Sequence, residues 1–201
     1  MAFINISRKY VFLATARTGS TSCYRELEKI SIENNDQFIS QIGEQPDLYH
    51  IGLKEFLLYY PEYKEFLFFA TVRNPETRLI SAFKEFQKNE HLSWSHSILE
   101  FKNFEDYLDN LHNSDLRFSI HFQPQYFQLN TPEKRSVDKL IYFENLNKDF
   151  SITTKQLYGK PYFLNSVIRI TPREFIKSQT KQKLKDCARR LYQVDLDNYY
   201  S

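Results

Sequence analysis

An apolar run, a loop of small residues and a helical pattern follow one another near the start of the chain. Tyr10 to Ala14 reads YVFLA, a continuous apolar run typical of a strand buried on both faces of a parallel sheet. Residues 15–22, TARTGSTS, come next, and Cys23, Leu27 and Ile30 then recur at helical spacing. Because neighbouring parallel strands must be joined by a crossover, this order constrains the fold more than any other feature.

The same order occurs twice more. Phe66 to Val72 is a second buried-strand pattern, and apolar residues recur at helical spacing over 79–86. Between them, Asn74 suits an N-cap and Pro75 the first helical position, where a missing N–H costs nothing. A third strand is expected at Lys139 to Phe143, again before a helical segment. Strands that alternate with helices predict an α/β fold with a central parallel sheet.

Length and composition favour one folded domain. The 201 residues are 41% hydrophobic and include 18 Phe and 14 Tyr, enough apolar volume for a core, which argues against intrinsic disorder. We expect a single domain over residues 1–201 with a substrate-facing insertion near 89–132, a stretch rich in His, Asn, Ser and aromatic residues. Apolar residues on one face of 178–192 predict an amphipathic closing helix.

Charge and hydropathy exclude several classes of partner. Lys and Arg number 27 against 25 Asp and Glu, a balance that disfavours nucleic acid or an anionic membrane as the main partner. The longest apolar runs are five residues, far short of the roughly 20 that span a bilayer, so we predict no membrane span and a cytoplasmic protein. Cys23 and Cys187 lie far apart with no metal-ligand spacing, so no metal site is expected.

The loop over Arg17–Ser22 has the composition of an anion-binding turn. A loop between a buried strand and a helix directs backbone N–H groups and the positive end of the helix dipole to one point. Gly19 permits a close backbone approach, Ser20, Thr21 and Ser22 add hydroxyl donors, and Arg17 supplies a cation that can bind an oxyanion through two N–H groups. The chain has no GxxxxGK[ST] string, which disfavours an ATP or GTP hydrolase. A loop that merely caps the helix is the structural alternative.

The second strand ends in another candidate anion site. Arg73 follows Val72, and Ser81 lies in the helix after it. Ligands of open α/β sheets bind at the carboxyl ends of the strands, so both loops are expected at one sheet edge. Two such sites suit a nucleotide that carries phosphate at two positions. The alternative is that Arg73 only pairs with a carboxylate, such as that of Glu76 or Glu55.

These segments resemble a known family. Tyr10 to Ser22 (YVFLATARTGSTS) resembles the 5′-phosphosulfate loop of the sulfotransferases that use 3′-phosphoadenosine 5′-phosphosulfate (PAPS), and Phe69 to Phe83 (FATVRNPETRLISAF) resembles their 3′-phosphate motif. The closer match is to the carbohydrate sulfotransferases. The likeness continues, in order, through 47–50, 123–125, 137–150, 165–166 and a last helix that reaches Asp195.

The resemblance implies a fold, a donor and a set of roles. The fold would be a P-loop-like three-layer sandwich. Arg17, Thr18, Gly19, Ser20, Thr21 and Ser22 would bind the 5′-phosphosulfate, and Arg73 and Ser81 the 3′-phosphate, with adenosine 3′,5′-bisphosphate as product. The acceptor would be a hydroxyl of a sugar or other small metabolite. Arg17 departs from the Lys that many members carry there, although Arg occurs in related branches.

Transfer to a hydroxyl needs a base but no metal, provided that cationic side chains stabilise the leaving oxygen. Histidine suits this role at neutral pH. His50 matches the position of the catalytic His in the carbohydrate enzymes and is assigned as the base, with Arg17 as the second catalytic residue. His121 is an alternative base or, with Gln125, an acceptor contact. Glu55 could orient or replace His50, which could also be a core or helix-capping residue.

Two other functions stay open at this point. A nucleotide-binding module without catalysis would keep both loops but lack a usable base. A phosphotransferase of P-loop type is opposed by the missing Walker lysine. Neither the acceptor nor the oligomeric state can be derived from the sequence.

Overall fold

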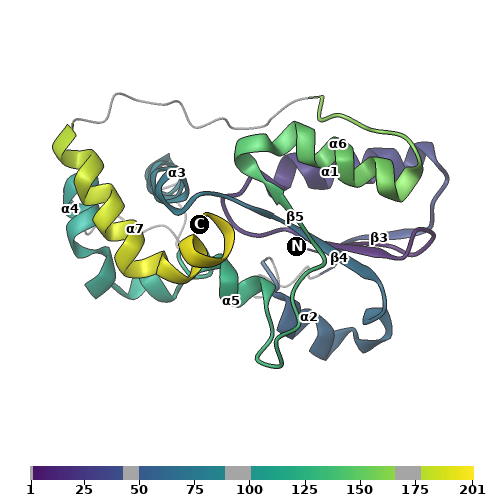
Figure 1. The fold of residues 1–201 in the computed structure, drawn as a ribbon, viewed down its shortest axis with the longest axis horizontal. Helices are drawn as coiled ribbons and strands as arrows, with labels where there is room; N and C mark the ends of the chain where they lie inside the picture. Colours follow the sequence, from purple (N-terminus) through teal and green to yellow (C-terminus); the bar gives the residue numbers. More distant parts are fainter. Residues whose placement is uncertain (1, 43–49, 89–100, 166–177) are drawn as a thin grey trace. The chain divides into compact units, whose positions relative to one another are not determined.

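The computed structural model describes residues 2–42, 50–88, 101–165 and 178–201. It divides into two compact units, one of Met1–Arg73 with Phe127–Ile170 and one of Asn74–Tyr126 with Thr171–Ser201. We describe each unit by itself (Figure 1). The single domain expected over residues 1–201 stays a prediction, as does the substrate-facing insertion, of which 89–100 lies outside the described residues.

The first unit is built on a five-stranded sheet with the order β3-β1-β2-β4-β5. The strands are β1 (Ala2–Asn5), β2 (Tyr10–Leu13), β3 (Phe38–Ile42), β4 (Leu67–Val72) and β5 (Lys139–Tyr142). The three strands predicted from apolar runs are therefore confirmed, each one residue shorter at one end. β2, β4 and β5 pair in parallel, with Leu13 opposite Ala70 and Val72 opposite Tyr142.

The predicted parallel pairing holds for β2, β4 and β5, but the sheet also has an antiparallel side that was not predicted. β1 runs antiparallel to both β2 and β3. Only residues 6–9 separate β1 from β2, and a connection this short can join only antiparallel neighbours. The pattern AFIN ends in polar Asn5 and does not stand out as a strand in the sequence, although all four residues are buried.

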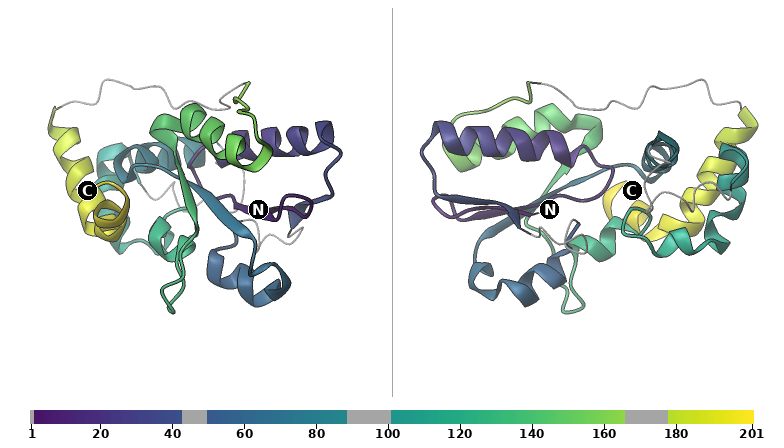
Figure 2. Two further views of the ribbon diagram at one scale, coloured as in Figure 1. Left: turned by 45° about the vertical axis from the view of Figure 1, so that its right-hand side comes forward. Right: turned by 180° about the vertical axis from the view of Figure 1, so that it is seen from behind.

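Helices cover both faces of this sheet, as Figure 2 shows within the first unit. α1 (Ser20–Glu33) and α6 (Leu146–Tyr158) share one face, while α2 (Leu53–Tyr59) lies on the other. Cys23 and Leu27 of α1 and Phe150 of α6 pack in one core with Phe12 and Phe69 of the strands. The α/β class with a helix-flanked sheet is thus confirmed, while the P-loop-like assignment stays a prediction.

The second unit is helical in its described part. α3 (Pro75–Lys88), α4 (Phe104–Asn110) and α7 (Ser178–Tyr199) bury a core that includes Phe86, Tyr107 and Leu184. Pro75 is the first residue of α3, and Asn74 Oδ1 accepts the Glu76 N–H at 3.0 Å, as predicted for a cap. The closing helix runs beyond its predicted end to Tyr199, with a kink at Tyr192.

The remaining short elements are η2 (Pro61–Tyr63), η4 (Leu111–Asn113), η5 (Asp115–Phe118), α5 (Gln125–Leu129) and η6 (Phe143–Asn145).

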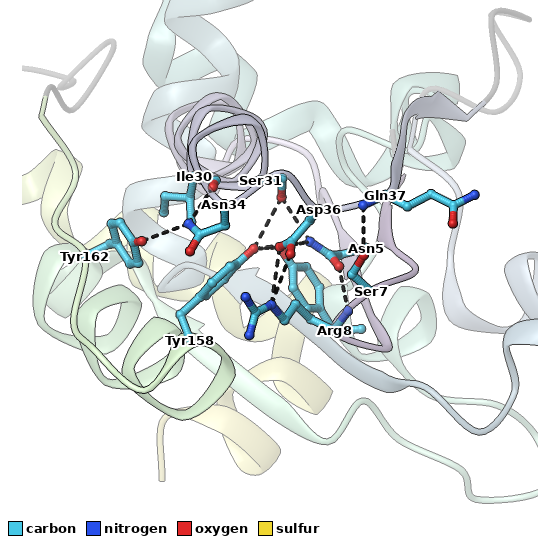
Figure 3. A network of polar contacts seen from close by, with 11 residues as sticks. Asn5, Ser7, Arg8, Ile30, Ser31, Asn34, Asp36, Gln37, Tyr158 and Tyr162 are labelled. Carbon is cyan, nitrogen blue, oxygen red and sulfur yellow. Dashed lines mark hydrogen bonds and ion pairs between the residues drawn. The ribbon is translucent and has the colours of Figure 1, made fainter.

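A polar cluster, here called the far-end network, lies where β2 begins and α1 ends (Figure 3). Buried Asn5 donates through Nδ2 to Ser31 Oγ at 3.0 Å, Asp36 Oδ2 at 2.9 Å and the Tyr158 hydroxyl at 3.2 Å. Arg8 Nε lies 3.2 Å from Asp36 Oδ1. Burial raises the pKa of Tyr158, so its hydroxyl stays protonated near neutral pH. The network consists of Asn5, Arg8, Ser31, Asp36 and Tyr158.

Candidate active site

The two loops predicted to bind anions meet at the carboxyl ends of β2 and β4. These strands are parallel neighbours in the sheet. Arg73, directly after β4, places Nη1 3.4 Å from the carbonyl oxygen of Arg17. The prediction that both loops share one sheet edge is confirmed by this pairing.

Backbone geometry gives the first loop the shape of an anion cradle. Arg17 has φ 65° and Gly19 φ 78°, both in the left-handed region. Gly19 is the N-cap of α1 and has no side chain with which to cap the helix. Because the first N–H groups of a helix have no intrahelical partner, those of Ser20 and Thr21 lie at the positive end of the helix dipole. A left-handed backbone conformation at a residue such as Arg17 costs about 1–2 kcal/mol, and strain of this kind is typical of functional turns.

Gly19 is required for space as well as for its φ. A Cβ on Gly19 would lie 2.9 Å from Phe143 Cδ2 and 3.1 Å from Leu146 Cδ2. The first distance is shorter than real Cβ contacts show, and the second is tighter than most of them. The turn is therefore held against the segment that follows β5.

Hydroxyl groups tie this loop to β4 from the inside. Thr15 Oγ1 donates to the carbonyl oxygen of Thr71 and lies 2.9 Å from Thr18 Oγ1, which itself is 2.6 Å from Thr71 Oγ1. Ser20 Oγ donates to the Thr15 carbonyl at 2.9 Å. Thr18 is fully buried, so its hydroxyl serves the fold. The hydroxyls of Thr18 and Ser20 thus bond inward, whereas Thr21 is exposed.

Arg73 is held by an aromatic ring. Its side chain is buried, and its Cζ lies 4.0 Å from the centroid of the Phe143 ring. A guanidinium on a ring face is attracted by the negative face of the π system and is held flat. The bond to Arg17 employs one of the five N–H donors of the guanidinium.

His50 adjoins the start of the first loop. Its Nδ1 lies 2.9 Å from the carbonyl oxygen of Ala14, the residue after β2. A carbonyl oxygen can only accept, so Nδ1 carries the proton, and in the neutral ring Nε2 has the lone pair. In this tautomer Nε2 can accept a proton, as a general base must. The Ala14 carbonyl therefore helps to orient His50, and a role for Glu55 in orienting or replacing it stays a prediction.

Glu55 lies at the beginning of the adjacent helix. Gly52 is the N-cap of α2, and a Cβ there would meet Glu55 Oε2 at 2.7 Å and the Gln128 carbonyl oxygen at 2.9 Å. A negative charge in the first turn of a helix interacts favourably with the positive end of the helix dipole. This position lets the charge of Glu55 stabilise α2.

Other predicted site residues lie in the second unit. Ser81 is buried in α3, and its part in the 3′-phosphate site stays a prediction. Gln125 is fully buried, and its Nε2 donates to Asp195 Oδ2 at 3.2 Å. His121 packs edge-on to Phe86 with ring centroids 5.4 Å apart. Acceptor contacts by His121 and Gln125 stay predictions, and the internal bond of Gln125 favours a structural role.

The sequence interpretation missed residues that order these segments. Buried Arg78 donates to the carbonyl oxygens of Gln123 at 2.9 Å and His121 at 3.1 Å. Asp195 accepts the N–H groups of Gln125 and Tyr126 at 2.9 and 2.8 Å. Phe143 in the first unit was missed as well. An Arg at a helical core position, one turn after Asn74, was the available signal for Arg78.

Comparison with known proteins identifies the family. A model of the sulfotransferase family matches residues 6–200, almost the whole chain. The chain belongs to the sulfotransferase family. No curated protein and no solved structure matches it significantly. The resemblance drawn from the two loops is thereby confirmed, and sulfuryl transfer is the general activity of this family.

The described residues contain neither a metal-binding cluster nor a membrane-spanning helix. Within 2–42, 50–88, 101–165 and 178–201, no three His, Cys, Asp or Glu side chains gather as a metal-ion site. No helix in that part of the sulfotransferase is both long and apolar enough to cross a bilayer. The cytoplasmic location expected from the sequence stays a prediction.

Proposed function

We propose that this sulfotransferase takes its sulfuryl group from PAPS and transfers it to a hydroxyl of a carbohydrate or small metabolite. The observation that carries the proposal is the meeting of the two loops, where Arg73 contacts the carbonyl of Arg17 beside the N-terminus of α1. A ligand with phosphate groups at two separate positions is the natural partner of two adjacent anion sites.

The donor set fits a phosphosulfate. Backbone N–H groups at the start of α1, the Arg17 side chain and the exposed Thr21 hydroxyl all suit an oxyanion. Gly19 lets the turn adopt its left-handed φ and pack against Phe143 and Leu146, which supports the backbone N–H groups from behind. Arg73, with Ser81, is proposed for the 3′-phosphate.

The protein's part in the reaction is positioning, charge stabilisation and proton removal. PAPS, when bound, supplies the sulfuryl group. His50 Nε2 removes the acceptor's hydroxyl proton while the new O–S bond forms in line with the S–O bond that breaks. Arg17 and the N–H groups of Ser20 and Thr21 stabilise the charge that develops on the departing phosphate oxygen. The proposal uses cationic groups for this and calls for no metal.

Nucleotide binding tests the donor assignment. Isothermal titration calorimetry should show that adenosine 3′,5′-bisphosphate binds about 10- to 150-fold more tightly than 5′-AMP, because charged hydrogen bonds to the second phosphate are each worth about 1.5–3 kcal/mol. Equal affinity for the two nucleotides would leave Arg73 without the proposed ligand and would contradict the proposal.

Substitution of His50 tests the base. In His50→Asn an amide N–H can still donate to the Ala14 carbonyl, but no group can accept the hydroxyl proton. We expect kcat for sulfuryl transfer to fall about 10²- to 10⁴-fold with the affinity for the bisphosphate retained. His112→Asn is the control, since His112 contacts Arg190 in the second unit. Unchanged turnover in His50→Asn would exclude His50 as the base.

A further inference from the structure

We infer that Phe143 is a positioning residue for donor recognition: its ring sets the plane of the Arg73 guanidinium and holds it in register with the turn at Gly19. The inference rests on the proposed function, because it concerns how Arg73 meets the 3′-phosphate. Phe143 belongs to neither of the two anion-binding loops.

Sheet register brings Phe143 to Arg73. β4 and β5 are parallel neighbours, with Val72 opposite Tyr142. Arg73 and Phe143 are thus each the first residue beyond the end of its strand. The distance of 4.0 Å from Arg73 Cζ to the ring centroid follows from this register, and it is the closest cation–ring approach recorded among the described residues.

The same ring also limits the first loop. Phe143 Cδ2 and Cε2 lie 2.9 and 3.1 Å from where a Cβ of Gly19 would be. One half-buried side chain therefore contacts both the turn assigned to the 5′-phosphosulfate and the arginine assigned to the 3′-phosphate. The spacing between the two anion sites depends on its size and orientation.

An aromatic ring suits this task better than a carboxylate would. A long arginine side chain loses about 2 kcal/mol of rotamer entropy when it is fixed, and a ring that fixes it beforehand lowers this cost on binding. An acidic side chain at position 143 could also hold the guanidinium, but it would neutralise the charge that attracts phosphate. Phe143 holds the guanidinium without adding a negative charge that would compete with phosphate.

The test compares how well variants distinguish adenosine 3′,5′-bisphosphate from 5′-AMP, measured by calorimetry on the full chain. Phe143→Leu should lower the ratio of the two affinities about 3- to 30-fold, the range of a cation–π contact, with 5′-AMP affinity within about twofold of wild type. Phe143→Tyr keeps the ring face and should retain the ratio. Phe163→Leu removes an exposed ring from the same unit and should leave both affinities unchanged.

A double-mutant cycle separates positioning from packing. If Phe143 acts through Arg73, then Phe143→Leu should have no further effect on the affinity ratio in an Arg73→Ala background. An unchanged ratio in folded Phe143→Leu, or an equal loss of affinity for both nucleotides, overturns the inference. So does a further drop in the ratio in the Arg73→Ala background.

Folding of the variants is checked by circular dichroism and thermal unfolding. Phe143→Met, which fills similar space without a ring face, replaces Phe143→Leu if that variant unfolds. Failure of both to fold would make Phe143 a residue of the core alone and would overturn the inference. Failure of the wild type to prefer the bisphosphate would instead contradict the proposed function, so the two failures are distinguishable.

Discussion

Two polar clusters lie at opposite ends of β2 and α1, and they organise their charges differently. The far-end network balances its charges internally, since Arg8 pairs with Asp36 and buried Asn5 donates to three side chains. At the other end, residues 15–22 and 71–74 contain two arginines and no Asp or Glu. There the threonine hydroxyls bond inward and fix the backbone.

This difference separates a cluster that stabilises the fold from one that can bind a ligand. A buried polar group without partners costs about 1–3 kcal/mol, so the far-end network gains by satisfying its own members. A binding site needs donors aimed at a ligand and a rigid support behind them. At the site end, Thr15, Thr18 and Thr71 bond to one another as the support, and the turn around Arg17 and Gly19 would present the donors proposed above.

The largest expected difference between the two ends concerns their arginines. Arg17→Gly should lower kcat about 10²- to 10³-fold, the loss typical of removing one group that stabilises the leaving oxygen. The melting temperature should not fall, because glycine relieves the left-handed φ of 65°. Arg8→Gly at the far end should leave kcat within about threefold of wild type. Transfer assays and thermal unfolding measure both, and comparable kcat losses in the two variants would erase the distinction.

The next largest effect concerns two glycines with nearly the same φ. Gly19→Ala should lower the free energy of unfolding by about 2–5 kcal/mol, since strain at φ 78° adds to the overlap with Phe143 and Leu146. Gly159→Ala, at φ 76° with nothing within 4 Å, should cost only about 1–2 kcal/mol. Urea denaturation gives both values. Equal losses would show that contact with Phe143 is unimportant.

The smallest expected effect separates stability from binding. Asn5→Ala should cost about 1–3 kcal/mol of stability, because Ser31 and Asp36 lose a buried donor, while the affinity for the bisphosphate stays within about twofold. Thr71→Val removes the hydroxyl that contacts Thr18 and should weaken both stability and binding. Denaturation and calorimetry on the two variants provide the comparison. Weaker binding in Asn5→Ala would mean that the far end also shapes the site.

Local patterns predicted much of the first unit. The strands at Tyr10–Leu13 and Leu67–Val72 stand out because buried parallel strands are continuous apolar runs. The edge strand Lys139–Tyr142 stands out through its apolar residues 140–142, although only Ile141 is buried. β1 and β3 escaped prediction because polar residues, such as Asn5 and Ser40, interrupt their apolar patterns. The polar positions make sense only in three dimensions, since Asn5 is buried but satisfied by Ser31 and Asp36.

Candidate site residues were predictable to a different degree. Arg17, Gly19 and Arg73 were found because their types and their places after strands match anion binding. The division of labour among the hydroxyls was not predictable, since Thr18 and Ser20 turn inward while Thr21 is exposed. Side-chain direction in a tight turn depends on which neighbours offer acceptors, and Thr71 belongs to another strand.

The sequence alone determined the alternation of strands and helices, the chemistry of both loops and membership of the sulfotransferase family. These properties are encoded in residues close together along the chain, because the spacing of hydrophobic residues and the composition of turns determine local secondary structure. Tertiary structure decided that His50 bonds to Ala14 and that one ring of Phe143 contacts both Gly19 and Arg73. Such contacts join residues far apart in the chain, and they arise only when strand register and helix packing bring them together.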